Sequence, residues 1–411
     1  MTDSGSAVRD SVLSTIGTIA QGASRFAYTV IVGRLLGADV LAATNTAFAV
    51  SILLSLLGPT AAGNAAAAFG GTSQTGSQTA KKLTAMMVWL GAALGAVALV
   101  TTQLLGGDGT APLMVAALTI SWSWYIFGRG VRFGMRQVPA VAVWDTVTGA
   151  LSIALLISVI LAQATPLVLA PAVIGYGTFA LASLVGAWRA APGHTGRKRP
   201  AASTQPMANF LIWSSLSLIA TNGIMQVSMV FAAVFDSPAR AGLFAAALSL
   251  ATPLSMLAQA VTPALLPRFA QWSLLPRSER TRSIQRATLT LSALLGTGVV
   301  IAITLLPWVL PIVFGQDFAG AVPLAQGLMV AVFGFSLSVF LSAYLAAIGR
   351  ARISTVATGS STVVGLLIMV GVSIGLGGAV GAVIGTGSAM ILSAGLLAAI
   401  SLWPGKRESV G

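Results

Sequence analysis

The sequence has 411 residues, of which 56% are hydrophobic and only 8% are charged, whereas about 25% of the residues of a soluble domain are charged. This composition excludes an ordinary water-soluble protein, because so few charged side chains cannot cover the surface of so long a chain. With no cysteine and a single histidine, a disulfide framework, a thiolate metal site and a histidine cluster are also excluded.

Twelve apolar stretches follow one another along the chain, each long enough to cross a bilayer as a helix. They lie at residues 10–33, 40–69, 80–105, 110–130, 138–162, 166–190, 207–235, 241–267, 286–314, 321–347, 352–376 and 378–403. Residues that favour turns separate them, as at Gly70, Pro166 and Gly377. The sequence therefore predicts an all-α polytopic membrane protein with about 12 transmembrane helices.

The basic residues indicate how these spans are oriented. When the loops are placed on alternate sides of the membrane, 19 of the 22 Lys and Arg residues fall on one side, including Arg129, Arg132 and Arg136. Lys and Arg are retained in short cytoplasmic loops, so we expect both termini in the cytoplasm and the chain in the bacterial inner membrane. The net charge of +13 then reflects topology. No nucleic-acid partner is expected, because no basic face stands in a soluble domain.

Two polar segments interrupt the pattern on the cytoplasmic side. The first divides the chain near its middle and predicts four parts: an N-terminal six-helix bundle at 1–190, a linker at 191–206, a C-terminal six-helix bundle at 207–403 and a tail at 404–411. The two halves show parallel loop patterns, as expected for a repeat about an axis along the membrane normal. The second segment, Arg268–Arg286, is either a short amphipathic piece on the inner leaflet or a solvated loop.

Short motifs resemble, in order and spacing, those of polysaccharide flippases in the multidrug/oligosaccharidyl-lipid/polysaccharide (MOP) exporter superfamily. The segments that carry the resemblance are Arg34–Asp39, Ala241–Phe244, Leu265–Arg268, Leu310–Phe318, Leu345–Arg350 and Gly377–Ala382. Their order and spacing match across nearly the whole chain, although each segment is unspecific alone. The seventh helix departs from the family pattern, because Asn222 and Gln226 stand where an acidic residue is common.

The resemblance implies two six-helix bundles of the MOP and MATE-like kind, which move cargo across the membrane by alternating access. The implied cargo is a lipid-linked oligosaccharide or polysaccharide precursor, and the implied coupling partner is a proton or a sodium ion. The other implied partners are membrane lipid and polysaccharide-assembly proteins. No cofactor, no metal and no enzymatic activity are expected.

Two other functions stay open. An ion-coupled, multidrug-type exporter of small molecules has the same fold, and a membrane-embedded glycan polymerase or transferase is the rival from another class. The sequence has no GxxxxGK[ST] phosphate-binding loop, which argues against ATP hydrolysis by this chain. The short external loops argue against the polymerase, because such an enzyme usually needs a large external loop that carries acidic residues or arginines.

Arg25 and Asp145 are the two charged residues that sit well inside predicted spans. A charge at mid-bilayer costs about 2.5–3.5 kcal/mol on insertion scales, which makes such residues candidates for function. In a flippase, the guanidinium of Arg25 would hold the pyrophosphate of a lipid-linked sugar by paired hydrogen bonds. The alternative is an arginine that extends to the membrane interface or pairs with a helix carbonyl.

Asp145 has two interpretations as well. As an ion-coupling carboxylate it would be neutralised when a proton or cation binds, and as a structural residue it would pair with Arg25 or with a neighbouring backbone group. Trp144 beside it is a candidate for contact with a sugar ring.

Polar residues in the first and seventh helices are further candidates for substrate binding. Gln21 and Tyr28 share a face of the first helix, and Asn222 and Gln226 lie in the seventh. They would line a cavity and bind sugar hydroxyls, or they would join helices by hydrogen bonds worth about 0.6 kcal/mol each in a membrane. An aromatic group in the fourth helix, Trp122 to Phe127, is typical of a belt at the level of the lipid headgroups.

Overall fold

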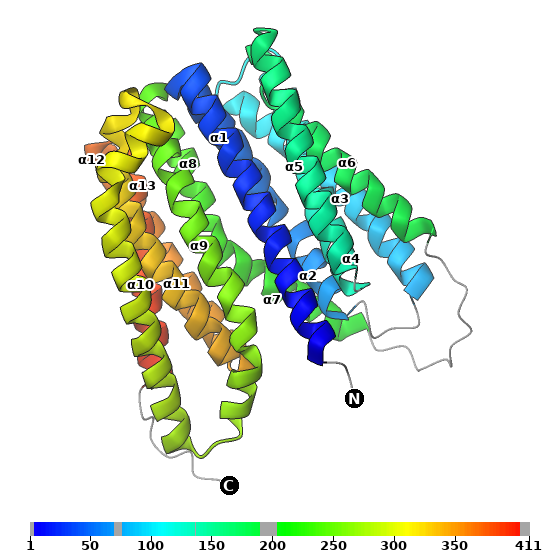
Figure 1. The fold of residues 1–411 in the computed structure, drawn as a ribbon, viewed down its shortest axis with the longest axis vertical. Coiled ribbons are helices and arrows are strands. Elements are labelled where there is room, and N and C mark those ends of the chain that lie inside the picture. The colour runs from blue at the N-terminus through cyan, green and yellow to red at the C-terminus, as the bar shows by residue number, and fades with distance from the viewer. Residues whose placement is uncertain (1–3, 70–75, 136, 190–203, 403–411) are drawn as a thin grey trace. The chain divides into compact units, whose positions relative to one another are not determined.

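The computed structural model describes residues 4–69, 76–135, 137–189 and 204–402, and all secondary structure in these ranges is helical (Figure 1). Up to Gly223 the helices are α1 (Ser4–Ser55), α2 (Pro59–Phe69), α3 (Gly76–Leu104), α4 (Ala111–Gly134), α5 (Val138–Leu161), η1 (Thr165–Leu167), α6 (Ala170–Arg189), α7 (Thr204–Leu218) and η2 (Ile219–Gly223). From Ile224 on they are α8 (Ile224–Phe235), α9 (Pro238–Ser273), α10 (Arg277–Phe314), η3 (Gln316–Ala321), α11 (Val322–Ala347), α12 (Ala351–Leu376) and α13 (Gly378–Leu402).

Ten of the described helices are long and apolar enough to cross a membrane. The first two predicted spans begin as one helix, α1, which Gly37 breaks with φ 87° and ψ 179°, a backbone conformation that favours glycine. The predicted span 241–267 lies in α9, which is not among the ten, and the side chains of 256–264 in α9 lie outside the described residues. The prediction of an all-α polytopic membrane protein is confirmed.

The segment Arg268–Arg286 is neither a solvated loop nor an isolated amphipathic piece. Helix α9 continues to Ser273 and α10 begins at Arg277, so that only a short turn separates them. Two long helices therefore carry the arginines of this segment.

The chain divides into two compact units, Met1–Val230 and Phe231–Gly411, here called unit 1 and unit 2. The division falls within α8, beyond the predicted linker at 191–206. Most of that linker lies outside the described residues, so the predicted domain boundaries stay a prediction.

In unit 1, α4 packs against α1, α2, α3 and α6, while α5 packs against α1 and α6. Helices α2 and α4 cross at Gly63 and Gly130. A Cβ at Gly63 would lie 2.8 Å from the carbonyl oxygen of Ile126, and a Cβ at Gly130 would meet the main chain of Gly63. The two backbones thus pack at a distance that only small residues allow, as is usual for helices in a membrane.

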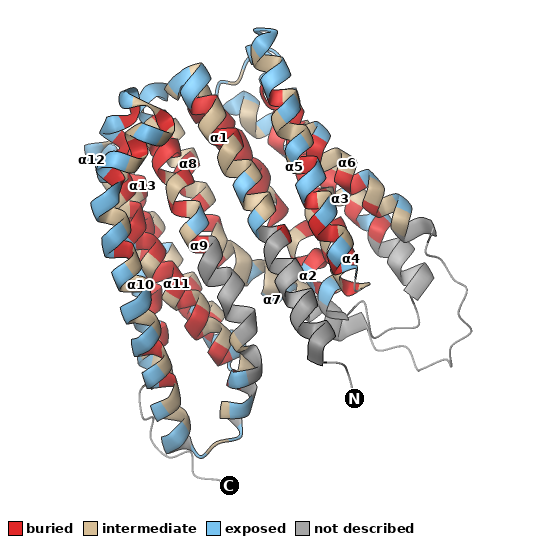
Figure 2. Ribbon diagram, in the orientation of Figure 1, coloured by how far each residue is buried: buried red, intermediate tan, exposed pale blue. Residues whose placement is uncertain are grey.

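In unit 2, α11 packs against α9, α10, α12 and α13. An aromatic group stands at one end of this core, where the ring of Phe269 lies edge-on to Phe340 at 5.3 Å and to Tyr344 at 5.9 Å between centroids. Figure 2 shows buried residues along the sides of the helices that face their neighbours within each unit.

Candidate functional site

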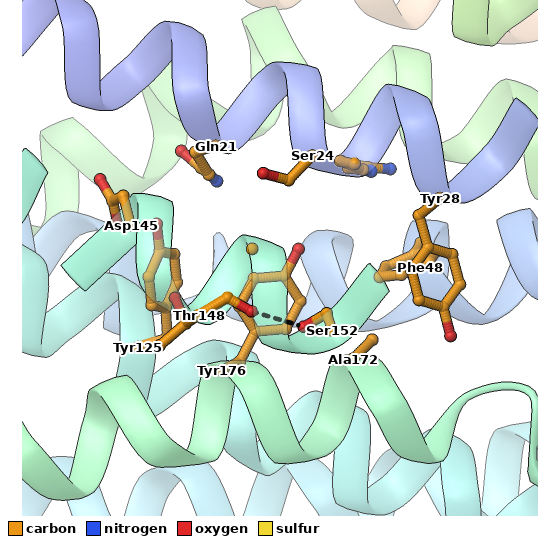
Figure 3. A pocket seen from close by; sticks show the side chains of 12 residues that line it. Gln21, Ser24, Tyr28, Phe48, Tyr125, Asp145, Thr148, Ser152, Ala172 and Tyr176 are labelled. Carbon is orange, nitrogen blue, oxygen red and sulfur yellow. Dashed lines mark hydrogen bonds between the residues drawn. The ribbon is translucent and has the colours of Figure 1, made fainter. Parts of the chain in front are cut away.

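A pocket in unit 1 lies between α1, α4, α5 and α6 (Figure 3). Its charged and polar lining includes Arg25 from α1, Tyr125 from α4, Asp145 from α5 and Tyr176 from α6. The pocket leaves about 20 Å³ for solvent-sized groups, which is room for about one or two water molecules. In this conformation it accommodates an ion or water, and a phosphate or a sugar needs more space.

Helix α1 contributes one continuous face to this pocket. Gln21, Ser24, Arg25 and Tyr28 line it, as their spacings of three and four residues predict. The guanidinium of Arg25 stands 5.0 Å from the ring centroid of Phe48, a cation–π arrangement. In Figure 3, Gln21 and Asp145 lie at one end of the pocket and Tyr28 and Phe48 at the other.

The hydroxyl of Tyr28 donates a hydrogen bond to the carbonyl of Val168. This bond ties the pocket face of α1 to the residues before α6. The predicted residues Gln21, Arg25 and Tyr28 thus lie together, and their role in binding substrate stays a prediction.

Asp145 is held by two donors from α4. Its carboxylate accepts a hydrogen bond of 2.7 Å from the hydroxyl of Tyr125 and one of 3.1 Å from Nε of Arg129. The side chain of Asp145 is fully buried and that of Arg129 is 12% exposed, so this is a buried ion pair. Among the described residues, the partners of Asp145 are therefore on the neighbouring helix, and no ion pair joins it to Arg25.

Arg129 and Arg132 both lie in helix α4 rather than in a loop, and their position on the cytoplasmic side stays a prediction. Helix α4 runs to Gly134 as part of a candidate membrane span, four residues beyond the predicted end. Arg129 is retained there because Asp145 supplies its counter-charge. Arg132 is buried and donates hydrogen bonds of 2.8 Å to the hydroxyl of Ser183 and to the carbonyl of Ala182.

An aromatic wall closes the pocket on the side of α4 and α6. Tyr125 packs against Tyr176 and Phe179, with ring centroids 5.0 and 4.7 Å apart, and Trp122 packs against Tyr176 at 4.9 Å. Trp122 and Tyr125 are 6% and 1% exposed, so the prediction of an aromatic belt at the headgroups is wrong for them. Both are bonded inside the bundle, since Tyr125 donates to Asp145 and the indole of Trp122 donates a hydrogen bond of 3.2 Å to the hydroxyl of Ser55.

Three predicted site residues do not line the pocket. Trp144 packs beside the aromatic wall, against the cluster that contains Trp122 and Phe179. Asn222 lies in the π-helical turn η2, where its amide donates a hydrogen bond of 3.0 Å to the hydroxyl of Thr221. Gln226 follows in α8, and neither it nor Asn222 is among the residues that line the pocket.

No protein-family model matches the chain, and no curated protein matches it in sequence. Solved structures do match it over nearly its whole length. A eukaryotic MATE transporter, AtDTX14, is 14% identical with a TM-score of 0.67 and covers 96% of this chain and 95% of its own. The fold is that of the MATE transporters.

Two further structures extend the likeness to bacterial and archaeal proteins. A variant of the MATE transporter VcmN from Vibrio cholerae is 13% identical, has a TM-score of 0.60 and covers 96% of this chain and 94% of its own. A MOP superfamily transporter from Pyrococcus furiosus is 17% identical, has a TM-score of 0.57 and covers 94% of this chain and 93% of its own. For that transporter, a reversed polarity of the binding pocket has been taken to suggest a different function.

Within this MATE fold, sequence reasoning missed the site residues Tyr125, Arg129 and Tyr176, and the first two lie on the same helix. A signal for these two was present in the chain. Trp122, Tyr125, Arg129 and Arg132 are spaced by three, four and three residues, which puts them on one face of a helix. A face that joins aromatic and basic residues next to a span with a lone aspartate indicates an intramembrane ion pair.

Proposed function

We propose that this chain is a membrane transporter that works by alternating access, and that its cargo is a lipid-linked oligosaccharide or polysaccharide precursor. The observation that carries the choice of cargo is the charge of the unit 1 pocket. Asp145 is balanced by Arg129, whereas Arg25 has no carboxylate within ion-pair distance among the described residues. The pocket therefore has one uncompensated positive charge, which complements the pyrophosphate of such a cargo.

The energetic cost of Arg25 supports this choice. A charge in the membrane interior costs about 2.5–3.5 kcal/mol on insertion scales. The cation–π contact with Phe48 returns about 2 kcal/mol when it is desolvated. An anionic ligand supplies the remaining stabilisation, and planar guanidinium is the side chain that binds phosphate oxygens in pairs.

The small volume of the pocket requires a movement before cargo binds. Ser24 of α1 packs directly against Gly149 of α5, where no Cβ keeps the helices apart. We propose that α1 moves away from α5 to admit the phosphate groups, which gives Arg25 access to them. The fold of the MATE transporters supports a mechanism that alternates between such conformations.

Asp145 is our candidate for coupling to a proton or a sodium ion. The charged and titratable groups around it are Tyr125 and Arg129 from α4, Arg25 from α1 and Tyr176 from α6. If Asp145 takes up a proton, Arg129 loses its counter-charge and the pocket becomes more positive. Uptake of a proton and binding of an anionic cargo would then favour each other.

We also propose that the chain resides in the bacterial inner membrane with both termini in the cytoplasm, surrounded by membrane lipid and near polysaccharide-assembly proteins. The asymmetry of the basic loops supports this orientation. Reporter tags placed in the Arg197-Lys198-Arg199 run and beside Asp317 should be found on opposite sides of the membrane.

The multidrug-type exporter remains the second candidate, because solved structures with this fold include multidrug resistance transporters. The pocket argues against a cationic drug as cargo, since Arg25 would repel it. The glycan polymerase is disfavoured because the structures that share the fold are transporters rather than enzymes.

The test is a flipping assay in reconstituted vesicles with a fluorescent undecaprenyl-linked oligosaccharide. We expect transport by the unaltered protein, loss of transport in Arg25→Ala and partial retention in Arg25→Lys, which keeps the charge but not the planar fork. Arg34→Ala, an exposed arginine of the same helix, is the matched control and should transport normally. Full transport by Arg25→Ala would remove the anion-binding role, and transport of a cationic dye in place of the lipid would favour the multidrug exporter.

The coupling role is tested by the same assay at several values of external and internal pH. We expect the unaltered protein to respond to a pH gradient and Asp145→Asn to lose that response. An unchanged pH profile in Asp145→Asn would assign Asp145 a structural role only. A response to sodium at constant pH, lost in the same variant, would identify sodium as the coupling ion.

A further inference from the structure

Helix α10 is longer than the membrane is thick. Its 38 residues extend over about 57 Å, whereas the 26 residues of α12 extend over about 39 Å and the hydrocarbon core is about 30 Å thick. The polar residues of α10 are concentrated at its beginning, after the short turn from α9 (Figure 1). The first turns of α10 therefore lie outside the hydrocarbon and in the layer of lipid headgroups.

The packing at the N-terminal end of α10 determines which face of the helix is exposed. Ile284 is fully buried in a cluster with Phe269 and Tyr344. Residues of the opposite face, Arg282, Arg286 and Leu289, are exposed, and their spacings of four and three residues put them in one stripe along the helix. The stripe therefore begins with two arginines and continues as an apolar surface.

The apolar part of this stripe is the surface that meets lipid. Leu289 is 71% exposed and Val300, eleven residues further along the same face, is 63% exposed. Side chains of a helix lean toward its N-terminus, so the guanidinium of Arg286 lies on the Arg282 side of its Cα atom, away from the hydrocarbon. Both arginines thus precede, on the same face of the helix, the apolar surface along which an acyl chain runs.

Within the described part of the chain, the two arginines, Arg282 and Arg286, have no ion-pair partner, although Glu279 lies in the same helical turn region. Like charges four residues apart on a helix repel each other. An anion that binds both would remove this repulsion.

We propose that Arg282 and Arg286 bind the phosphate of an anionic phospholipid of the surrounding leaflet. Each guanidinium donates to phosphate oxygens, and the acyl chains of the same lipid lie against the stripe of Leu289 and Val300. The continuity of the basic pair with a lipid-facing surface identifies a lipid as the occupant. An acidic protein surface or a free phosphate ion has no acyl chain that would pack against the apolar part of the stripe.

The test measures phospholipids that remain bound to the purified full-length protein, by native mass spectrometry after mixing with phosphatidylglycerol and phosphatidylcholine in equal amounts. We expect a preference for phosphatidylglycerol that falls about tenfold or more in Arg282→Gln/Arg286→Gln, because each basic residue near the surface contributes to anionic-lipid binding. Arg282→Lys/Arg286→Lys should keep a large part of the preference. Thermal melting in detergent checks that each variant is folded.

The matched control is Arg350→Gln/Arg352→Gln, which removes the same charge at the turn between α11 and α12. This control should keep the preference for phosphatidylglycerol. An equal loss in both double variants would overturn the proposal, because the net charge of this end would then explain binding. Displacement of the lipid by millimolar inorganic phosphate would also overturn it, in favour of a free-phosphate site.

Discussion

The two units are both helical bundles, yet they bury different kinds of polar group. Unit 1 buries Arg132 and Asp145, with Arg129 nearly as enclosed. In the described part of unit 2 the Asp236 side chain is 4% exposed, but its partner Arg240 is 56% exposed. The other buried polar residues there are serines and threonines, and many of them bond to their own helix, as Ser336 does to the carbonyl of Val332 at 2.8 Å. A hydroxyl bonded in this way costs a helix little, whereas a charge in a membrane is costly. The comparison therefore supports our proposal that the functional chemistry lies in unit 1.

The largest expected effect comes from separating the buried ion pair of unit 1. Arg129→Met leaves Asp145 without its counter-charge, and breaking a buried pair from one side costs about 3–5 kcal/mol. We expect a large fall in the midpoint of thermal or detergent-induced unfolding. The loss should shrink at low pH, because a protonated Asp145 needs no counter-charge.

The double variant Arg129→Met/Asp145→Asn is the control for this effect. It should be more stable than Arg129→Met alone, because it removes the uncompensated carboxylate. If Arg129→Met unfolds at the same midpoint as the unaltered protein, the pair contributes nothing and the contrast between the units loses its basis.

A second prediction concerns what the two units share, the close approach of helix backbones. Gly130→Ala in unit 1 places a Cβ against the main chain of Gly63, and Gly385→Ala in unit 2 places one against Met369 and the carbonyl of Gly365. Overpacking of this kind costs about 1–3 kcal/mol, so both variants should lose stability to a similar extent. Gly371→Ala, where a Cβ meets nothing within 4 Å, is the matched control and should unfold like the original chain. A loss of stability in only one unit would mean that close backbone contacts stabilise one bundle and not the other.

The third prediction separates the two donors of Asp145. Tyr125→Phe removes the hydroxyl at 2.7 Å and keeps the ion pair, so we expect a loss of about 1 kcal/mol, near the upper part of the range for hydrogen bonds in membranes. Tyr176→Phe is the control from the same pocket wall and should change stability less. The difference between the two variants should vanish in the background Asp145→Asn, and its persistence there would show that Tyr125 acts by packing alone.

Most of the fold follows from apolar stretches in the sequence. The predicted spans 138–162, 352–376 and 378–403 agree with α5, α12 and α13 to within one residue at each end. Such spans are predictable because a helix pairs all of its backbone hydrogen-bonding groups internally. In lipid, a long apolar segment therefore has few other stable conformations. The face of α1 that carries Gln21, Arg25 and Tyr28 was also predictable, because residues three or four positions apart in a helix lie on the same face.

The partner of Asp145 was not predictable from single spans. Arg129 lies near the end of the predicted span 110–130, where the rule for cytoplasmic arginines counts it with the basic residues of the cytoplasmic side. Its place inside the bundle depends on Asp145, sixteen residues away on another helix. A rule that considers each span separately cannot predict a contact between two helices. Tyr176 from α6 was missed for the same reason.

The smallest expected effect concerns the ion pair of unit 2, between Arg240 and Asp236 at 3.3 Å. The side chain of Arg240 is 56% exposed, although that of Asp236 is only 4% exposed. Because solvent screens the arginine, and exposed pairs contribute about 0–1 kcal/mol, Arg240→Gln should lower stability by about 1 kcal/mol at most. High salt should remove even this difference, because it screens exposed charges, whereas the effect of Arg129→Met should persist in salt. Asp236→Ala should cost more than Arg240→Gln, because the Asp236 carboxylate also accepts a hydrogen bond from the amide of Ala379 at the start of α13. Equal losses from Arg129→Met and Arg240→Gln would show that burial does not distinguish the two pairs, and the assignment of the site to unit 1 would then rest on the pocket alone.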